Sequence, residues 1–209
     1  QREFTRLSSQ NYFLRAKSFD SVTAKAGQGG RDTATIIGSP LAETLTAGPR
    51  WAELVGPGRQ VHVQNFASIR VDGQAGRDTA ILYDSPQDDH VTLRPGLVQM
   101  NTPKYQLEVL HFEDITARSQ AGGRDVAQLF DSPGNDRFIS LADESVLSGP
   151  SFLFRVQQFA TVHGYSINGG QDVAILYGEA EPSRWAVHQE QTTVTSSSCY
   201  RRAKAFEEV

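Results

Sequence analysis

The sequence has very little cysteine: Cys199 is the one thiol in 209 residues. A single thiol forms no internal disulfide, and no histidine pair lies near it at the spacing of zinc ligands. These absences exclude a disulfide-stapled scaffold and a structural zinc site.

Long hydrophobic runs and a surplus of basic charge are also missing. The apolar stretches are strand-sized, such as residues 152–154, whereas a bilayer span needs roughly 20 apolar residues. The 20 basic and 24 acidic residues are interspersed and give a net charge of -4. Because the apolar stretches are too short, we expect no membrane span. Because nucleic-acid binding needs a basic stripe, we also expect no nucleic-acid partner. The chain starts at Gln1 without a signal region, so we expect a processed product or an excerpt of a longer protein.

What the sequence does have is an internal repeat. Five phenylalanines are separated by 47, 46, 47 and 47 residues: Phe19, Phe66, Phe112, Phe159 and Phe206. The spacing divides the chain into a partial copy (1–18), copy one (19–65), copy two (66–111), copy three (112–158), copy four (159–205) and the start of a fifth (206–209). We expect one repeat array rather than separate domains.

Each copy continues with a glycine-rich turn and an aspartate. These aspartates are Asp32, Asp78, Asp125 and Asp172. Alanine follows two residues later and isoleucine or leucine four residues later, which is the period of a strand with one buried face. Large apolar residues recur thirteen residues after the aspartate, ending with Trp185 in copy four.

These patterns predict an all-β tandem-repeat solenoid. Turn signals divide each copy into about five short strands, and the nearly gapless spacing indicates equivalent side chains stacked on one another. We expect a right-handed, parallel β-helix-like fold with about two coils per repeat, forming a rod on the order of 40 Å long at the usual strand spacing. A four-bladed β-propeller is the alternative.

Three segments carry a family resemblance: GGRDVAQLFDSPGNDRF, NYFLRAKSFDSVTA and CYRRAKAFEEV. They resemble the repeat of very large predicted surface or secreted proteins of planctomycete-type bacteria, which reads approximately YNRAKxFxxVxAYxxxGGNDxAxLYDSxGNDxF. The resemblance covers essentially the whole chain and implies repetition and an extracellular or cell-surface setting, with no assigned activity. Only copy three keeps the Asp-Ser-Pro-Gly-Asn-Asp turn, at residues 131–136.

Calcium is the metal that this turn suggests. Glycine- and aspartate-rich repeats can enclose Ca²⁺ between carboxylates of successive turns, which makes Asp125, Asp131 and Asp136 a candidate site. The spacing of eleven residues between Asp125 and Asp136 differs from the nine of such repeats. We favour a structural role, in which the aspartate after Gly-Gly bonds its own backbone at a corner.

Catalysis requires convergent groups that break the repeat. The histidines fall at five different repeat positions: His62, His90, His111, His163 and His188. Copy four, with Trp185, His188 and Glu190, is where a polysaccharide-active groove would lie, although Trp185 is expected in the core. Arg31, Arg77 and Arg124 are expected on a solvated face, as are Arg201, Arg202 and Lys204.

The leading hypothesis is a non-catalytic, extracytoplasmic structural module that stacks end to end as a spacer, fibre or surface building block. Its partner would be another copy or the continuation of a longer chain. The alternatives are a carbohydrate-active or polysaccharide-binding β-helix, with surface polysaccharide as partner, and a calcium-dependent adhesive module.

Overall fold

The computed structural model describes residues 4–8, 13–17, 19–27, 29–102, 104–178 and 182–209. The described residues form strands and turns and no helix. The strands before copy two are β1 (Phe4–Ser8), β2 (Phe13–Lys17), β3 (Ser21–Lys25), β4 (Thr33–Ile37), β5 (Thr44–Gly48), β6 (Trp51–Gly56) and β7 (Arg59–Gln64). Copy two contains β8 (Ser68–Asp72), β9 (Thr79–Tyr83), β10 (His90–Arg94), β11 (Leu97–Asn101) and β12 (Gln106–Leu110).

Copies three and four repeat the same series. Copy three contains β13 (Asp114–Arg118), β14 (Val126–Phe130), β15 (Arg137–Ser140), β16 (Glu144–Ser148) and β17 (Leu153–Gln157). Copy four contains β18 (Thr161–Tyr165), β19 (Val173–Leu176), β20 (Arg184–His188), β21 (Gln191–Thr195) and β22 (Tyr200–Lys204). Each copy therefore has five strands, which are called its first to fifth strands below.

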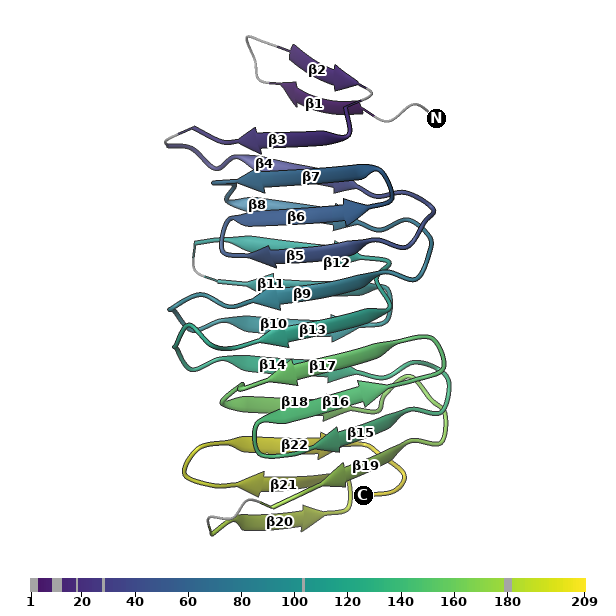
Figure 1. Cartoon of the computed structure of the whole chain (residues 1–209). Coiled ribbons are helices and arrows are strands. Elements are labelled where there is room, and N and C mark those ends of the chain that lie inside the picture. The colour runs from purple at the N-terminus through teal and green to yellow at the C-terminus, as the bar shows by residue number, and fades with distance from the viewer. Residues whose placement is uncertain (1–3, 9–12, 18, 28, 103, 179–181) are drawn as a thin grey trace.

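These strands build two ten-stranded sheets that face each other, so the chain is a β-solenoid and not a propeller (Figure 1). One sheet, here sheet B, has the order β19-β15-β16-β17-β13-β9-β5-β6-β7-β3. The other, sheet C, has the order β20-β21-β22-β18-β14-β10-β11-β12-β8-β4. Strands β1 and β2 form a separate two-stranded sheet at the N-terminal end.

The path of one repeat explains this order. The first strand lies in one sheet, the second strand crosses to the facing sheet, and the third to fifth strands return to the first sheet as an antiparallel meander. The next repeat then starts in the opposite sheet. Successive repeats are thus related by a half-turn about the long axis of the stack.

This path differs from the expected parallel coils, two per repeat. Parallel pairs link different segments of the path, such as β5 with β9, but the meander pairs are antiparallel. The reason lies in two-residue turns, such as Pro95-Gly96 between β10 and β11, where Gly96 has a φ of 80°. Proline followed by a residue of positive φ reverses the chain within its own sheet, so the third strand cannot continue around a coil.

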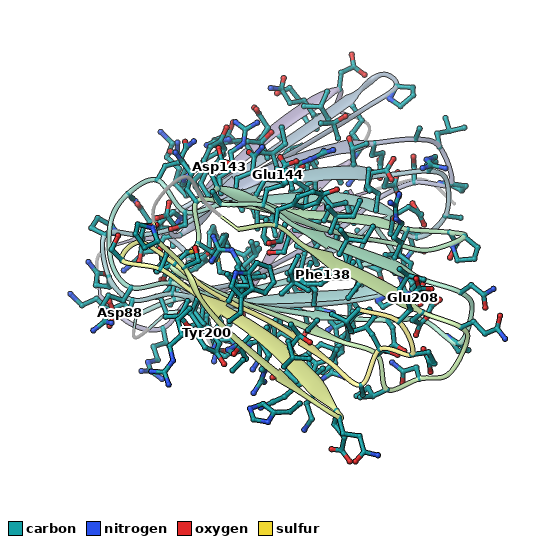
Figure 2. The ribbon with its side chains drawn as sticks, turned by 90° about the horizontal axis from the view of Figure 1, so that it is seen from below. Asp88, Phe138, Asp143, Glu144, Tyr200 and Glu208 are labelled. Carbon is teal, nitrogen blue, oxygen red and sulfur yellow. The ribbon has the colours of Figure 1, made fainter. Side chains whose placement is uncertain are left out.

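The core lies between the two ten-stranded sheets and consists of every second residue of their strands, except at the edge strand β20, where the inner-face residues are exposed. Leu45, Leu82, Leu129, Phe138 and Phe154 all have no exposed surface. Figure 2 looks along the stack from its C-terminal end and shows Phe138 between the two layers. The period-two pattern of the sequence is therefore confirmed, because alternate side chains of a strand point to opposite faces.

The repeated phenylalanine lies where the chain passes from a fifth strand to the next first strand. Phe66, Phe112 and Phe159 are buried, and each follows a residue with a φ between 56° and 68° that is not glycine. This left-handed residue turns the chain towards the opposite sheet and the phenylalanine into the core. Phe206 is partly buried and stacks on Phe138, whereas Phe19 is 65% exposed.

Two expectations about copy four and the last strand are wrong. Trp185 was expected in the core but is 46% exposed, because β20 is the edge strand of sheet C and no described strand pairs with its outer edge. Arg201 was expected to point outward, but it shares the inner face with Ala203 and is 3% exposed. Its guanidinium donates hydrogen bonds to the carbonyls of Ala142, Ala160 and Tyr200.

The first prediction compares Phe138 and Trp185, which occupy the same repeat position. Phe138→Ala should lower the free energy of unfolding by about 3–5 kcal/mol, because it opens a cavity in the closed core. Trp185→Ala should cost about 1 kcal/mol or less, since its ring is already half-exposed. Urea unfolding of both variants in dilute solution measures the difference, and equal losses would show that burial in the stack does not set stability.

Candidate functional site

The repeated aspartates lie at the corners of the solenoid, where one repeat contacts the next. The repeated aspartate opens the second strand, and one of its carboxylate oxygens accepts a backbone N–H from the start of the third strand of the preceding copy. Asp125 accepts from the N–H of Asp89, and Asp172 from that of Asp136, both at 2.7 Å. Asp78 accepts in the same way from Glu43, at 2.7 Å.

This bond corrects the expectation that the aspartate bonds its own backbone. The partner lies 35 or 36 residues earlier in the chain, so each bond joins two copies. Asp32 occupies the same position in copy one but is exposed, because no described preceding copy supplies the donor. The predicted structural role is supported, and its nature is a link between repeats.

A second acid closes the turn before the third strand. Asp136 accepts from the backbone N–H and the hydroxyl of Ser132, at 2.5 and 2.9 Å. Asp89 accepts from Ser85 in the same manner, and Glu43 accepts from the backbone N–H of Ser39 at 2.9 Å. Sequence reasoning missed Glu43 and Asp89, although an acid eleven residues after the repeated aspartate, with serine and proline before it, is visible in copies one to three.

A third acid reaches forward to the following copy. Asp131 accepts from the backbone N–H groups of Ile167 and Asn168, at 2.9 and 2.7 Å. Asp84 accepts from the N–H of Ala121 at 2.8 Å. These bonds order the glycine-rich loop before the next repeated aspartate, and they are missing from copies one and four, where Gly38 and Gly178 take the position of this acid.

Burial sets the electrostatics of the corners. Desolvation raises the pKa of Asp89, Asp125 and Asp136, and neighbouring carboxylates add to the rise, while the hydrogen bonds from serine oppose it. The donors at each corner therefore offset a desolvation cost that buried carboxylates would otherwise carry in full.

Asp78 is the least satisfied of these acids. In the later copies the second carboxylate oxygen accepts a serine hydroxyl, from Ser119 to Asp125 and from Ser166 to Asp172. The equivalent residue in copy two is Gly73, and Oδ2 of Asp78 has no partner although it is buried. Desolvation, with the charges of Glu43 and Glu113, raises the pKa of Asp78 to about 6.

The fold brings together a different set of three aspartates from the one expected to bind calcium. Asp131 and Asp136 do converge, but their third member is Asp172 and not Asp125, and ligand oxygens of these three lie within 4.8 Å of one another. Asp125 belongs to the preceding corner, with Asp89. Both carboxylate oxygens of each of the three accept protein donors, so a cation would compete with bonds that hold the turn.

Among the described residues, the contacts of His62, His111 and His163 involve carboxylates and aromatic rings. His111 lies 2.8 Å from the carboxylate of Asp72, and His62 lies 3.8 Å from that of Glu53. His163 packs against the rings of Tyr165 and Tyr200. None of these contacts joins a histidine to a hydroxyl or a thiol. His188 and Glu190 are exposed at the turn between β20 and β21.

The arginines that precede the repeated aspartates are exposed, as expected of a solvated face. Arg77 pairs with Asp114 at 3.0 Å, while Arg31 and Arg124 are also exposed and Gln171 takes the fourth position. Exposed ion pairs of this kind contribute little to stability. Cys199 is buried, and it occupies the repeat position of Tyr105 and Phe152.

No protein-family model matches the chain, and neither the curated proteins nor the solved structures include a significant match. In the part of the chain that the structure describes, there is no helix of the length and apolarity needed to cross a bilayer.

The second prediction concerns pH and Asp78. Because its folded pKa of about 6 lies above the ordinary 3.8, the folded state binds this proton more tightly, and the contribution of Asp78 to stability falls as pH rises from about 4 to 6. Asp78→Asn removes that fall, so the variant should gain stability relative to the wild type as pH increases through this window. Urea midpoints between pH 4 and 7.5 measure the gain, with Asp143→Asn at an exposed site as the control.

The wild-type curve alone does not isolate this effect. Burial lowers the pKa of His163 to about 4, so its contribution is lost in the opposite direction, as pH falls below about 6.5. The difference between the variant and the wild type cancels the histidine. A difference that does not change with pH would contradict the assigned pKa of Asp78.

The third prediction concerns calcium. Since the oxygens of Asp131, Asp136 and Asp172 already accept protein donors, the melting temperature should be the same in millimolar calcium and in chelator. Asp136→Asn is the matched variant, and it should lower stability by about 1–3 kcal/mol in both conditions because it weakens the serine turn. A transition that rises with calcium in the wild type and not in the variant would establish the metal site.

Proposed function

We propose that this chain is a non-catalytic structural module of the bacterial cell exterior, acting as a rigid spacer or scaffold. The main observation behind this proposal is that the acidic residues at the corners form hydrogen bonds between neighbouring repeats. Carboxylates that could do acid–base or metal chemistry are buried at the corners and accept backbone donors from neighbouring copies. Side chains committed to holding the stack together are not free for a substrate.

The shape supports the same function. Ten strands in each sheet, at a spacing of about 4.8 Å, give a stack on the order of 40 Å long. Every copy packs on its neighbours, so length can increase by adding repeats without a new core. The resemblance to repeats of large surface or secreted bacterial proteins supports the extracellular setting.

One surface favours a second candidate function, the binding of acidic polysaccharide. On the outer face of sheet C, Arg94 lies over the ring of Phe130, 3.7 Å from its centroid, and Phe130 stacks on Tyr165 at 4.7 Å. Arg202 donates to the hydroxyl of Tyr165, and Lys204 is the register partner of Tyr165. This row of cations and rings could bind a carboxylated sugar chain, although the two rings cover each other's faces.

The fourth prediction tests these functions together. Antibodies against the folded chain should label intact cells of the source bacterium, and the purified chain should release no product from acidic polysaccharides. Labelling only after permeabilisation would contradict the extracellular scaffold, and turnover would replace it with an enzyme.

The binding alternative has its own control. If the row on sheet C binds acidic polysaccharide, Arg94→Gln with Arg202→Gln should abolish retention on an immobilised polyuronate column, while Arg77→Gln, an exposed arginine outside the row, should not. Equal retention of all three proteins, or no retention of any, would remove this alternative.

A further inference from the structure

Both ends of the stack expose side chains that other copies bury. At the C-terminal end, Val187 is 73% exposed and Trp185 46%, on the inner face of β20. The residues at their repeat positions in β10, Val91 and Leu93, have no exposed surface. At the N-terminal end, Phe19 is 65% exposed, whereas its counterparts in copies two to four are 2–4% exposed. The two ends therefore leave apolar core positions uncovered.

The two ends also carry free strand edges of complementary type. In sheet C the order ends at β20, a third strand, and at β4, a second strand, and no described strand pairs with their outer edges. Inside the stack a third strand always pairs in parallel with the second strand of the next copy: β5 with β9, β10 with β14, and β15 with β19. The edges of β20 and β4 are thus the two halves of a pair that occurs three times in this chain.

The same complementarity holds in sheet B. Its order ends at β19, a second strand, and at β3, a first strand. Inside the stack, second and first strands pair in parallel, as β9 does with β13. At the edge of β19 the residues after Phe206 already make a start of such a pair, with Glu208 bridging Val173 in the register that Asp114 has with Thr79.

We propose that two copies of this chain join end to end, with β20 of one copy pairing in parallel with β4 of the next. The register follows from β15 and β19, where Phe138 pairs with Ala174. Trp185 then lies beside Ala34 of the second copy, Ala186 beside Thr35, and Val187 beside Ile36. The joint deepens the proposed scaffold function and rests on it, since it names the partner as a second copy.

The joint buries apolar side chains that are exposed at the ends of the separate copies. Trp185 and Val187 become inner-face neighbours of Ala34 and Ile36, which continues the core across the junction. Strand β3 of the second copy takes the edge of β19, so Phe19 occupies the place of Phe206 beside Phe138 and residues 206–209 are displaced. The pairing strands oppose no like charges, because β4 carries none and β20 carries a single arginine.

The hairpin of β1 and β2 fits this arrangement. Its register, with Phe4 opposite Lys17, is that of β21 and β22, where Gln191 lies opposite Lys204. These are the fourth and fifth strands of a copy, and a third strand would lie between them and β4. In the joint, β20 supplies that third strand and β21 and β22 of the same copy follow it, so the hairpin of the second copy moves aside.

The fifth prediction measures the joint by sedimentation over a range of concentrations. The wild-type chain should associate with increasing concentration. Val187→Lys and, from the other end, Phe19→Ser should each raise the concentration of half-association about tenfold or more, because each removes an apolar side chain that the joint buries. Both residues are exposed in the single copy, so the circular dichroism spectrum should not change.

The control is Thr193→Lys, which places the same charge on the outer face of β21, one strand inside the edge. It should associate like the wild type. A wild-type chain that stays monomeric at all concentrations, or an equal effect of Thr193→Lys and Val187→Lys, would overturn the joint.

Disulfide trapping tests the register. In a Cys199→Ala background, a chain with Ala186→Cys is mixed with a tagged chain carrying Thr35→Cys and is oxidised. Neighbouring strands hold register partners within reach of a disulfide, so this mixture should give several times more crosslinked heterodimer than a mixture with Thr33→Cys, two residues away on the same face. Equal or greater crosslinking to position 33 would overturn the proposed pairing.

The outcomes separate the joint from the scaffold function. A monomeric chain that labels intact cells would overturn the joint and leave the scaffold proposal standing. A chain that associates in the stated register but degrades polysaccharide would support the joint and overturn the scaffold.

Discussion

The hydrogen bond from a backbone N–H of one copy to the buried aspartate of the next is the interaction on which the stack depends. Apolar burial between two sheets is non-directional and would allow neighbouring repeats to slide. The bond from Asp136 to Asp172, and its equivalents at Asp125 and Asp78, fixes the third strand of one copy against the second strand of the next. A shift of one residue would break this bond and also turn the buried face of the strand outward.

The same bond explains why aspartates that resemble metal ligands in the sequence have a structural role in the fold. A buried carboxylate is stable only when donors surround it, and at these corners the donors are backbone N–H groups and serine hydroxyls. At Asp78, where Gly73 supplies no serine donor, burial and the charges of Glu43 and Glu113 raise the pKa to about 6. The corners vary in residue type from copy to copy, yet Glu43, Asp89 and Asp136 all keep a carboxylate at the start of the third strand.

A stack held by contacts between neighbours has ends that are chemically different from its middle. The repeated phenylalanine, aspartate and third-strand apolar residues are exposed at Phe19, Asp32 and Trp185, at the two ends of the described stack. The residues at the same repeat positions in the inner copies are buried. The exposed repeat positions at the ends are the observations from which the end-to-end joint is proposed.

The sequence by itself determined the all-β class, the copy spacing and most inner-face residues, because a strand buries every second residue and a stack repeats that pattern at constant length. It favoured the solenoid and left the propeller open. It did not show the antiparallel meander or the half-turn between copies, because a turn signal such as Pro95-Gly96 marks a reversal without showing which sheet the next strand joins. It also could not show that Asp172, and not Asp125, joins Asp131 and Asp136. Only the tertiary structure decided that point, because strand pairing between copies brings together residues about 36 positions apart.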